Sequence, residues 1–200
     1  LYDLGLADVE KVRVTGTAVV STDEVLAAAA VVPGVPLASV DTEGIAARVG
    51  EIAGVAAVDV GRGWLHTVTV AVTERVPVAV TGTPQGVLPV DAGGVVYPGP
   101  AAPELPRLTF GGVGPEDPAT RAALDVLAAL PEPLRAQVVA VDVDTGGGTA
   151  QVSLGLTEDR RVRWGRAERV AEKSSVLVAL LTQPGRVYDV TSPDLPTVRS

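Results

Sequence analysis

The residue types that could carry catalysis are few and scattered in this chain. His66 is the only histidine and there is no cysteine. A Ser-His-Asp triad would therefore depend on His66 as its base, and a cysteine-based zinc site is excluded. Asp142 and Asp144 stand two residues apart, so on a strand both carboxylates would share one face, as a metal or acid–base pair needs. The glycines at 146–148 favour a turn after Asp144 instead. These residues predict no catalytic site, no metal and no cofactor.

A dense basic stretch covers residues 160–173, and two interpretations of it stay open. Its members are Arg160, Arg161, Arg163, Arg166, Arg169 and Lys173. They could meet an acidic partner, phospholipid heads or an anionic wall polymer. The simpler interpretation is a solvated surface on which they pair with the acids that stand among them, Glu158, Asp159, Glu168 and Glu172.

Composition narrows the function class further. Hydrophobic residues make up 46% of the 200 residues, which predicts a folded chain. The net charge of the chain is −8, whereas nucleic-acid-binding proteins usually carry a basic surface, so we expect no nucleic-acid partner. The apolar run at 25–33 is far shorter than the roughly 20 residues that span a bilayer. We therefore expect any membrane anchor to lie outside these 200 residues.

The first 80 residues carry the signals of a strand, two helices and two further strands. Valines alternate with charged residues over 9–16, which predicts the first strand. A capping-box pattern at 21–24 predicts a helix over 22–32, and Asp41 or Thr42 can cap a second. Strands are expected at 55–60 and from residue 67, where apolar and polar residues alternate strictly.

From residue 81 onward the sequence predicts short strands, turns and two longer helices. The helices are expected at 117–130 and 167–181. The glycine turn after Asp144 predicts a hairpin between strands at 138–143 and 149–156. Further strands are expected at 161–164, 187–190 and 197–199. We predict an α+β protein with two domains, residues 1–80 and 81–200.

Several motifs, in order, resemble the FtsQ/DivIB family of bacterial cell-division proteins. They are Val12-Arg13-Val14-Thr15-Gly16, Gly34-Val35-Pro36-Leu37, Arg62-Gly63-Trp64, Glu74-Arg75-Val76-Pro77, Val90-Asp91-Ala92-Gly93-Gly94, Arg163-Trp164-Gly165 and Tyr188-Asp189-Val190. The resemblance implies an N-terminal POTRA domain (βααββ), followed by a mixed α/β "β domain" with a largely antiparallel sheet and two helices.

The resemblance also implies a function. Members of the family are bitopic proteins of the cell membrane at the division septum, and their outer part is a non-enzymatic scaffold of the divisome. FtsB, together with FtsL, would add a strand to the last sheet edge and so help to control septal peptidoglycan synthesis. The matching partner-binding residues are Tyr188, Asp189, Val190, Leu195, Thr197, Val198 and Arg199.

Two alternatives stay open at this point. A POTRA-containing secretion or outer-membrane assembly factor is one, although such proteins usually carry tandem modules before a barrel, and a single module is visible here. The other is a secreted enzyme with a mixed α+β fold. Such an enzyme needs a group of polar catalytic residues, which the sequence does not show.

Overall fold

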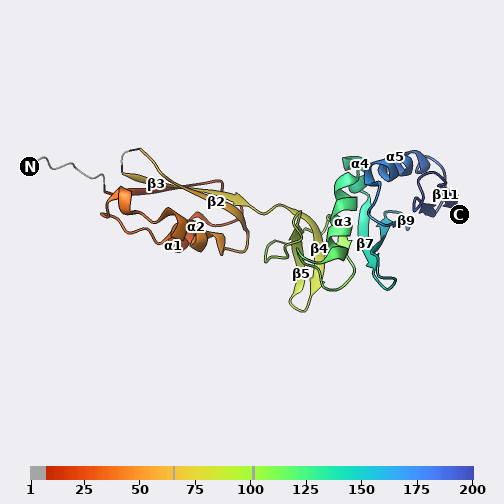
Figure 1. Ribbon diagram of the computed structural model, residues 1–200, viewed down its shortest axis with the longest axis horizontal. Helices are drawn as coiled ribbons and strands as arrows, with labels where there is room; N and C mark the ends of the chain where they lie inside the picture. Colours follow the sequence, from red (N-terminus) through yellow and green to blue (C-terminus); the bar gives the residue numbers. More distant parts are fainter. Residues whose placement is uncertain (1–7, 65, 101) are drawn as a thin grey trace, which may run out of the picture. The chain divides into compact units, whose positions relative to one another are not determined.

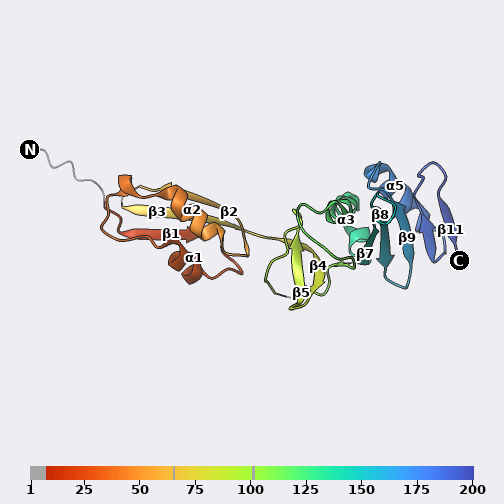
Figure 2. The same ribbon diagram turned by 60° about the horizontal axis from the view of Figure 1, so that its bottom comes forward.

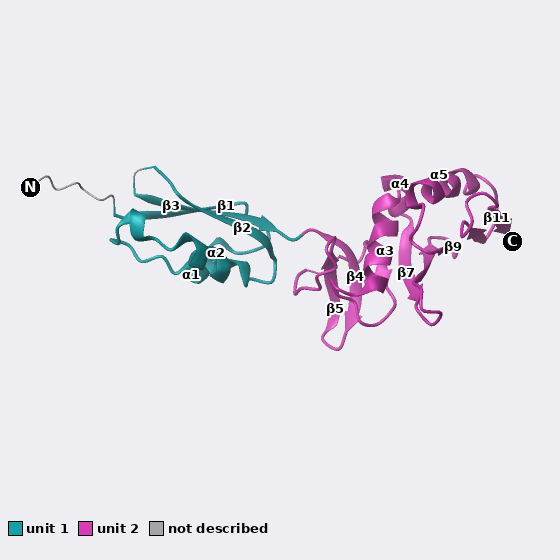
Figure 3. Ribbon diagram, in the orientation of Figure 1, with its two compact units in different colours: residues 1–75 teal, residues 76–200 magenta. Residues whose placement is uncertain are grey.

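The computed structural model describes residues 8–64, 66–100 and 102–200, which form two compact units that divide between Arg75 and Val76 (Figure 3). The domain boundary predicted after residue 80 lies within strand β4 (Pro77–Thr83). Both partners of β4, which are β5 and β6, belong to the second unit.

The first unit has the predicted βααββ order. Its elements are β1 (Lys11–Thr15), α1 (Thr22–Ala29), a 3-10 turn η1 (Leu37–Ser39), α2 (Thr42–Gly50), β2 (Val55–Arg62) and β3 (Thr67–Glu74). β3 is the middle strand of the sheet, with β1 parallel to it on one side and β2 antiparallel on the other. The two helices lie on one face of this sheet (Figures 1 and 2).

Local signals set the ends of these helices. The hydroxyl of Ser21 accepts a hydrogen bond from the amide of Asp23, and the carboxylate of Asp41 accepts one from Gly44. α1 ends earlier than the predicted residue 32, because Ala30 adopts a left-handed conformation with φ 47°. The alternation in β3 buries one face of the strand, where Val68 and Val70 are completely covered.

The second unit is built on an eight-stranded sheet in the order β11-β10-β9-β8-β7-β6-β4-β5. Its strands after β4 are β5 (Gly86–Asp91), β6 (Arg107–Leu108), β7 (Val138–Asp144), β8 (Gln151–Leu156), β9 (Arg161–Gly165), β10 (Val187–Asp189) and β11 (Thr197–Arg199). Its helices are α3 (Pro118–Ala129), the short α4 (Glu132–Arg135) and α5 (Val170–Leu180). Antiparallel pairs outnumber parallel ones, as predicted.

One face of this sheet packs against the helices. α3 and α5 lie on the same side of it (Figure 2). One row of side chains across the sheet is completely or almost completely buried in the core formed with these helices: Leu108, Val141, Leu154, Val162 and Tyr188. Because side chains alternate along a strand, the flanking rows point to the opposite face. We call this second surface the open face.

The start of α5 differs from the sequence prediction of residue 167. Arg169 adopts a left-handed backbone with φ 51°, so the helix begins at Val170. Lys173, on the first turn, is buried, and its ammonium donates hydrogen bonds to the carbonyls of Trp164 and Arg166. Burial lowers the pKa of Lys173.

Candidate partner-binding edge

The residues considered for catalysis do not come together. The Nδ1 atom of His66 lies 2.7 Å from the carbonyl oxygen of Asp8. Asp142 accepts a hydrogen bond from the hydroxyl of Thr109, and Asp144 accepts one from the amide of Gly146 inside the predicted turn. Within residues 8–64, 66–100 and 102–200, no cluster of His, Asp or Glu could hold a metal ion. These contacts have a structural role in loops and strand ends.

Strand β11 lies at one margin of the eight-stranded sheet. It pairs with β10 in antiparallel register, with Tyr188 opposite Val198 and Asp189 opposite Thr197. In the described part of the chain no strand lies beyond it. A strand in this position carries backbone N–H and C=O groups that can pair with another chain.

Two of the predicted partner-binding residues have buried side chains. Tyr188 is 2% exposed, and its hydroxyl donates to the carbonyls of Gln183 and Gly185. Val190 is fully covered, and its amide donates to the carbonyl of Arg163. These two residues hold β10 in the sheet, and their side chains are not accessible to a partner.

The remaining predicted residues lie at the surface or close to it. Leu195 is 79% exposed in the loop before β11. Thr197 and Arg199 are exposed, whereas Val198 is half-buried against the core. Asp189 is half-buried, and its carboxylate accepts hydrogen bonds from the amide and the hydroxyl of Thr191. Exposed side chains available for contact therefore lie on β11 and its preceding loop.

The opposite margin of the sheet, at β5, is occupied over the C-terminal half of the strand. Val96 forms an antiparallel bridge with Val90, and the amide of Tyr97 donates to the carbonyl of Pro89. Pro89 itself has no backbone donor, which further blocks strand addition. In the described part of the chain, the β5 margin is therefore covered at residues 89–91, whereas no segment pairs with the outer side of β11.

A contact between Arg169 and Asp194, which the sequence did not predict, holds the loop before β11. Arg169 forms hydrogen bonds with both carboxylate oxygens of Asp194 and with both oxygens of Glu172, at distances between 2.6 and 3.1 Å. The hydrogen bond to Asp194, and then the one to Glu172, raise the pKa of Arg169. No local signal links residues 169 and 194, because they lie 25 positions apart in the sequence.

The basic stretch separates into three groups in the structure. Arg160, Arg166 and Arg169 pair with the acids predicted for them, which confirms the simpler interpretation for these three. Lys173 is buried. Arg161 and Arg163 are exposed on the open face of β9, where neither forms an ion pair with a described residue.

In the part of the chain that the structure describes, no helix is both long enough and apolar enough to cross a membrane. This finding covers residues 8–64, 66–100 and 102–200 alone.

Comparison with known proteins gives matches in both units. A family described as the FtsQ-type POTRA domain matches residues 7–75. Over 200 residues the chain is 46% identical to a cell division protein FtsQ of Mycolicibacterium smegmatis and 40% identical to one of Mycobacterium tuberculosis H37Rv. Each match takes in all of this chain, which spans 59% and 63% of those two relatives. A cell division protein FtsQ of Streptomyces bingchenggensis is 37% identical over 212 residues, covering 99% of this chain and 78% of that protein.

Proposed function

The chain belongs to the FtsQ family of cell-division proteins, and from this premise we propose that it is the extracytoplasmic part of a divisome scaffold. In this proposal a membrane segment N-terminal to Leu1 anchors the protein at the division septum as a single-pass protein. The chain binds FtsB, together with FtsL, and through them helps to control septal peptidoglycan synthesis. It does so without catalysis of its own.

The observation that carries this proposal is the difference between the two margins of the eight-stranded sheet. The β5 margin is bridged by Val96 and carries Pro89, whereas β11 has one free side. A partner strand can pair there by a row of backbone hydrogen bonds, and the exposed Leu195 offers it an apolar contact. We place the FtsB contact at Leu195, Thr197, Val198 and Arg199, with β10 as its support.

The test is the affinity of an FtsB peptide for variants of this chain, measured by calorimetry. Deleting residues 195–200 removes β11, so we expect binding to be lost. Leu195→Glu keeps the strand but places a charge beside it, so we expect a clear loss of affinity. Circular dichroism of both variants checks that the rest of the chain stays folded.

The matched control is Val87→Glu on the β5 margin. Val87 is also an exposed apolar residue, at 39%, and it also lies on the outermost strand of the sheet. We expect this variant to bind as the wild type does. Wild-type affinity in the deletion variant, or equal losses in Leu195→Glu and Val87→Glu, would place the interface elsewhere.

A further inference from the structure

The open face carries a row of four residues on neighbouring strands. Arg107 on β6 lies beside Ala140 on β7, which lies beside Gly155 on β8, which lies beside Arg161 on β9. Both arginines are exposed, and the two residues between them are small. We call this row and the surface between its arginines the open-face groove.

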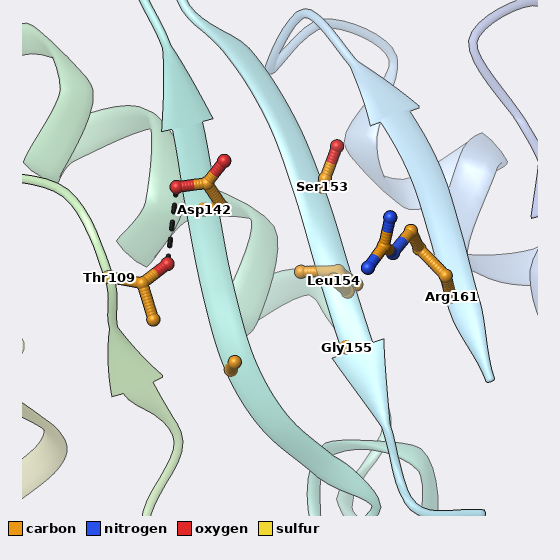
Figure 4. Close-up of a pocket in the computed structure, with 7 residues that line it drawn as sticks. Thr109, Asp142, Ser153, Leu154, Gly155 and Arg161 are labelled. Carbon is orange, nitrogen blue, oxygen red and sulfur yellow. Dashed lines mark hydrogen bonds between the residues drawn. The ribbon is translucent and has the colours of Figure 1, made fainter. Parts of the chain in front are cut away.

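The dimensions of this groove suit a helix. Neighbouring strands lie about 4.8 Å apart, so the backbones of Arg107 and Arg161 are separated by roughly 14 Å. An α-helix with its side chains is about 10–12 Å wide. A hollow of about 360 Å³ lies between Arg161 and Asp142, and Figure 4 shows the side chain of Arg161 reaching from β9 toward β8. A second hollow, of about 310 Å³, is lined by Arg107 and Val139 together with apolar residues of β4, β5 and the loop before β6. The Nη1 atom of Arg107 lies toward this side, 3.9 Å from the position of a Cβ at Gly82 of β4.

Two arginines of the open face lack the carboxylate partner that other arginines of this unit have. Five arginines of the unit each lie within 4 Å of a carboxylate: Arg121, Arg135, Arg160, Arg166 and Arg169. Arg163, Arg186 and Arg199 form no ion pair with a described residue. Arg107 and Arg161 form neither an ion pair nor a side-chain hydrogen bond with any described residue. The two unpaired cations lie on either side of the uncharged Ala140 and Gly155, so this row is complementary to a ligand with acids on both flanks; the carboxylate of Asp142 lies outside the row, where it accepts a hydrogen bond from Thr109.

The backbone chemistry of a sheet face selects a helix over a strand. The N–H and C=O groups of β7 and β8 already pair with their neighbours in the sheet, so a chain lying across the face gains no backbone partner there. A helix satisfies its own backbone groups and needs only side-chain contacts.

We infer that the open-face groove binds an acidic helix of another protein. Glu or Asp residues on the two flanks of the helix face Arg107 and Arg161. A ridge of small or apolar residues between them packs on Ala140, Gly155 and the 51%-exposed Val139. This surface lies on the face of the sheet and is separate from the backbone edge of β11, so the inference goes beyond the function proposed above.

The test uses a synthetic helical peptide with Glu on both flanks of a Leu and Ala ridge, titrated into the isotope-labelled 200-residue chain. We expect chemical-shift changes centred on β6 to β9. Arg107→Glu with Arg161→Glu should weaken binding roughly tenfold or more, because two attractive pairs become repulsive. Arg121→Glu, which reverses an arginine of α3 that already has a partner, is the control and should bind normally.

Gly155→Val tests the floor of the groove without changing any charge. A Cβ at position 155 would meet Ala140 Cβ at 3.5 Å and Val139 Cγ2 at 3.7 Å, which are ordinary contacts. A branched residue is also favoured in a strand. We therefore expect a folded protein with an unchanged or higher melting temperature and a clear loss of peptide affinity.

Three outcomes would overturn the inference. They are equal affinity in the wild type and in both groove variants, equal binding of a peptide with Lys in place of Glu, and binding of phosphatidylglycerol vesicles with no binding of the acidic peptide. Deleting residues 195–200 separates this inference from strand addition. The deletion should abolish FtsB binding and leave the acidic helix bound, so either idea can fail without the other.

Discussion

The carboxylate of Glu74 accepts a hydrogen bond from the amide of Ala18 at 2.7 Å, and so ties the end of β3 to the loop before α1. The amides of Val19 and Val20 donate to the same carboxylate. Three successive amides directed at one anion form a concave site that favours negative charge. These bonds, with Ala18 and Val19 contributing most, hold the pKa of Glu74 below its ordinary value of 4.5.

This contact predicts a pH dependence with a defined sign. Because the folded pKa is the lower one, the contribution of Glu74 to stability is present above pH 4.5 and is lost as the pH falls through the folded pKa. Glu74→Gln keeps the shape but removes the charge, so its unfolding free energy should fall less than that of the wild type upon acidification. Denaturant unfolding at several acidic pH values measures this, with Glu10→Gln as an exposed control. Parallel curves for wild type and Glu74→Gln would contradict the prediction.

Burial in the first unit predicts that substitutions at two adjacent positions of β3 lower stability by very different amounts. Val70 is fully buried, so Val70→Asp places a carboxylate in an apolar core and should cost about 3 kcal/mol or more. Ala71 points to the exposed face of the strand, opposite Asp59 on β2, so Ala71→Lys should lower stability by no more than about 0.5 kcal/mol. Thermal melting of both variants gives the comparison. An unchanged melting temperature for Val70→Asp would contradict the burial of Val70 and the register of β3 that places it in the core.

The contact between Arg169 and Asp194 should order the open margin of the sheet. Asp194→Asn removes the charge that faces the guanidinium, so amide hydrogen exchange at Thr197–Arg199 should become faster while the core remains protected. Arg166→Gln is the control, because Arg166 pairs with Glu168 and has no bond to this loop.

Acid should have the same effect as the Asp194→Asn substitution. The hydrogen bond from Arg169 lowers the pKa of Asp194, so the contact is complete above the ordinary value of 3.8 and weakens as the pH falls through the folded value. Unchanged exchange at β11 in Asp194→Asn would show that the strand is held by its pairing with β10 alone.

The division into two units predicts where the chain can be cut. Fragments 1–75 and 76–200 should each unfold cooperatively, since each has its own core. A fragment 81–200, cut at the boundary predicted from the sequence, loses Ala79 and Val80, which are buried beside β5 and β6. We expect it to melt at a lower temperature than 76–200. Equal melting of the two fragments would support the boundary at residue 80.

Local structure in this protein could be predicted from the sequence because it depends on short-range chemistry. The alternation over Thr67–Glu74 predicts a strand with one buried face, and the glycines after Asp144 predict the hairpin between β7 and β8. Asp117 and Pro118 mark the start of α3. The errors fall at Ala30 and Arg169, where a left-handed residue that is not glycine ends or delays a helix. Side-chain type alone gives little signal for such a conformation.

Strand order, burial and charge pairing were decided only by the tertiary structure. Two-residue β6 pairs between β4 and β7, an arrangement that depends on packing between segments far apart in the sequence. Tyr188 was predicted as a contact residue but lies in the core that includes Leu177 of α5, and its hydroxyl donates to carbonyls of the loop after α5. Neighbouring arginines have opposite surroundings for the same reason: Arg160 meets an acid, and Arg161 points to the open face without one. A sequence states which charges exist, and the fold determines which of them find a partner.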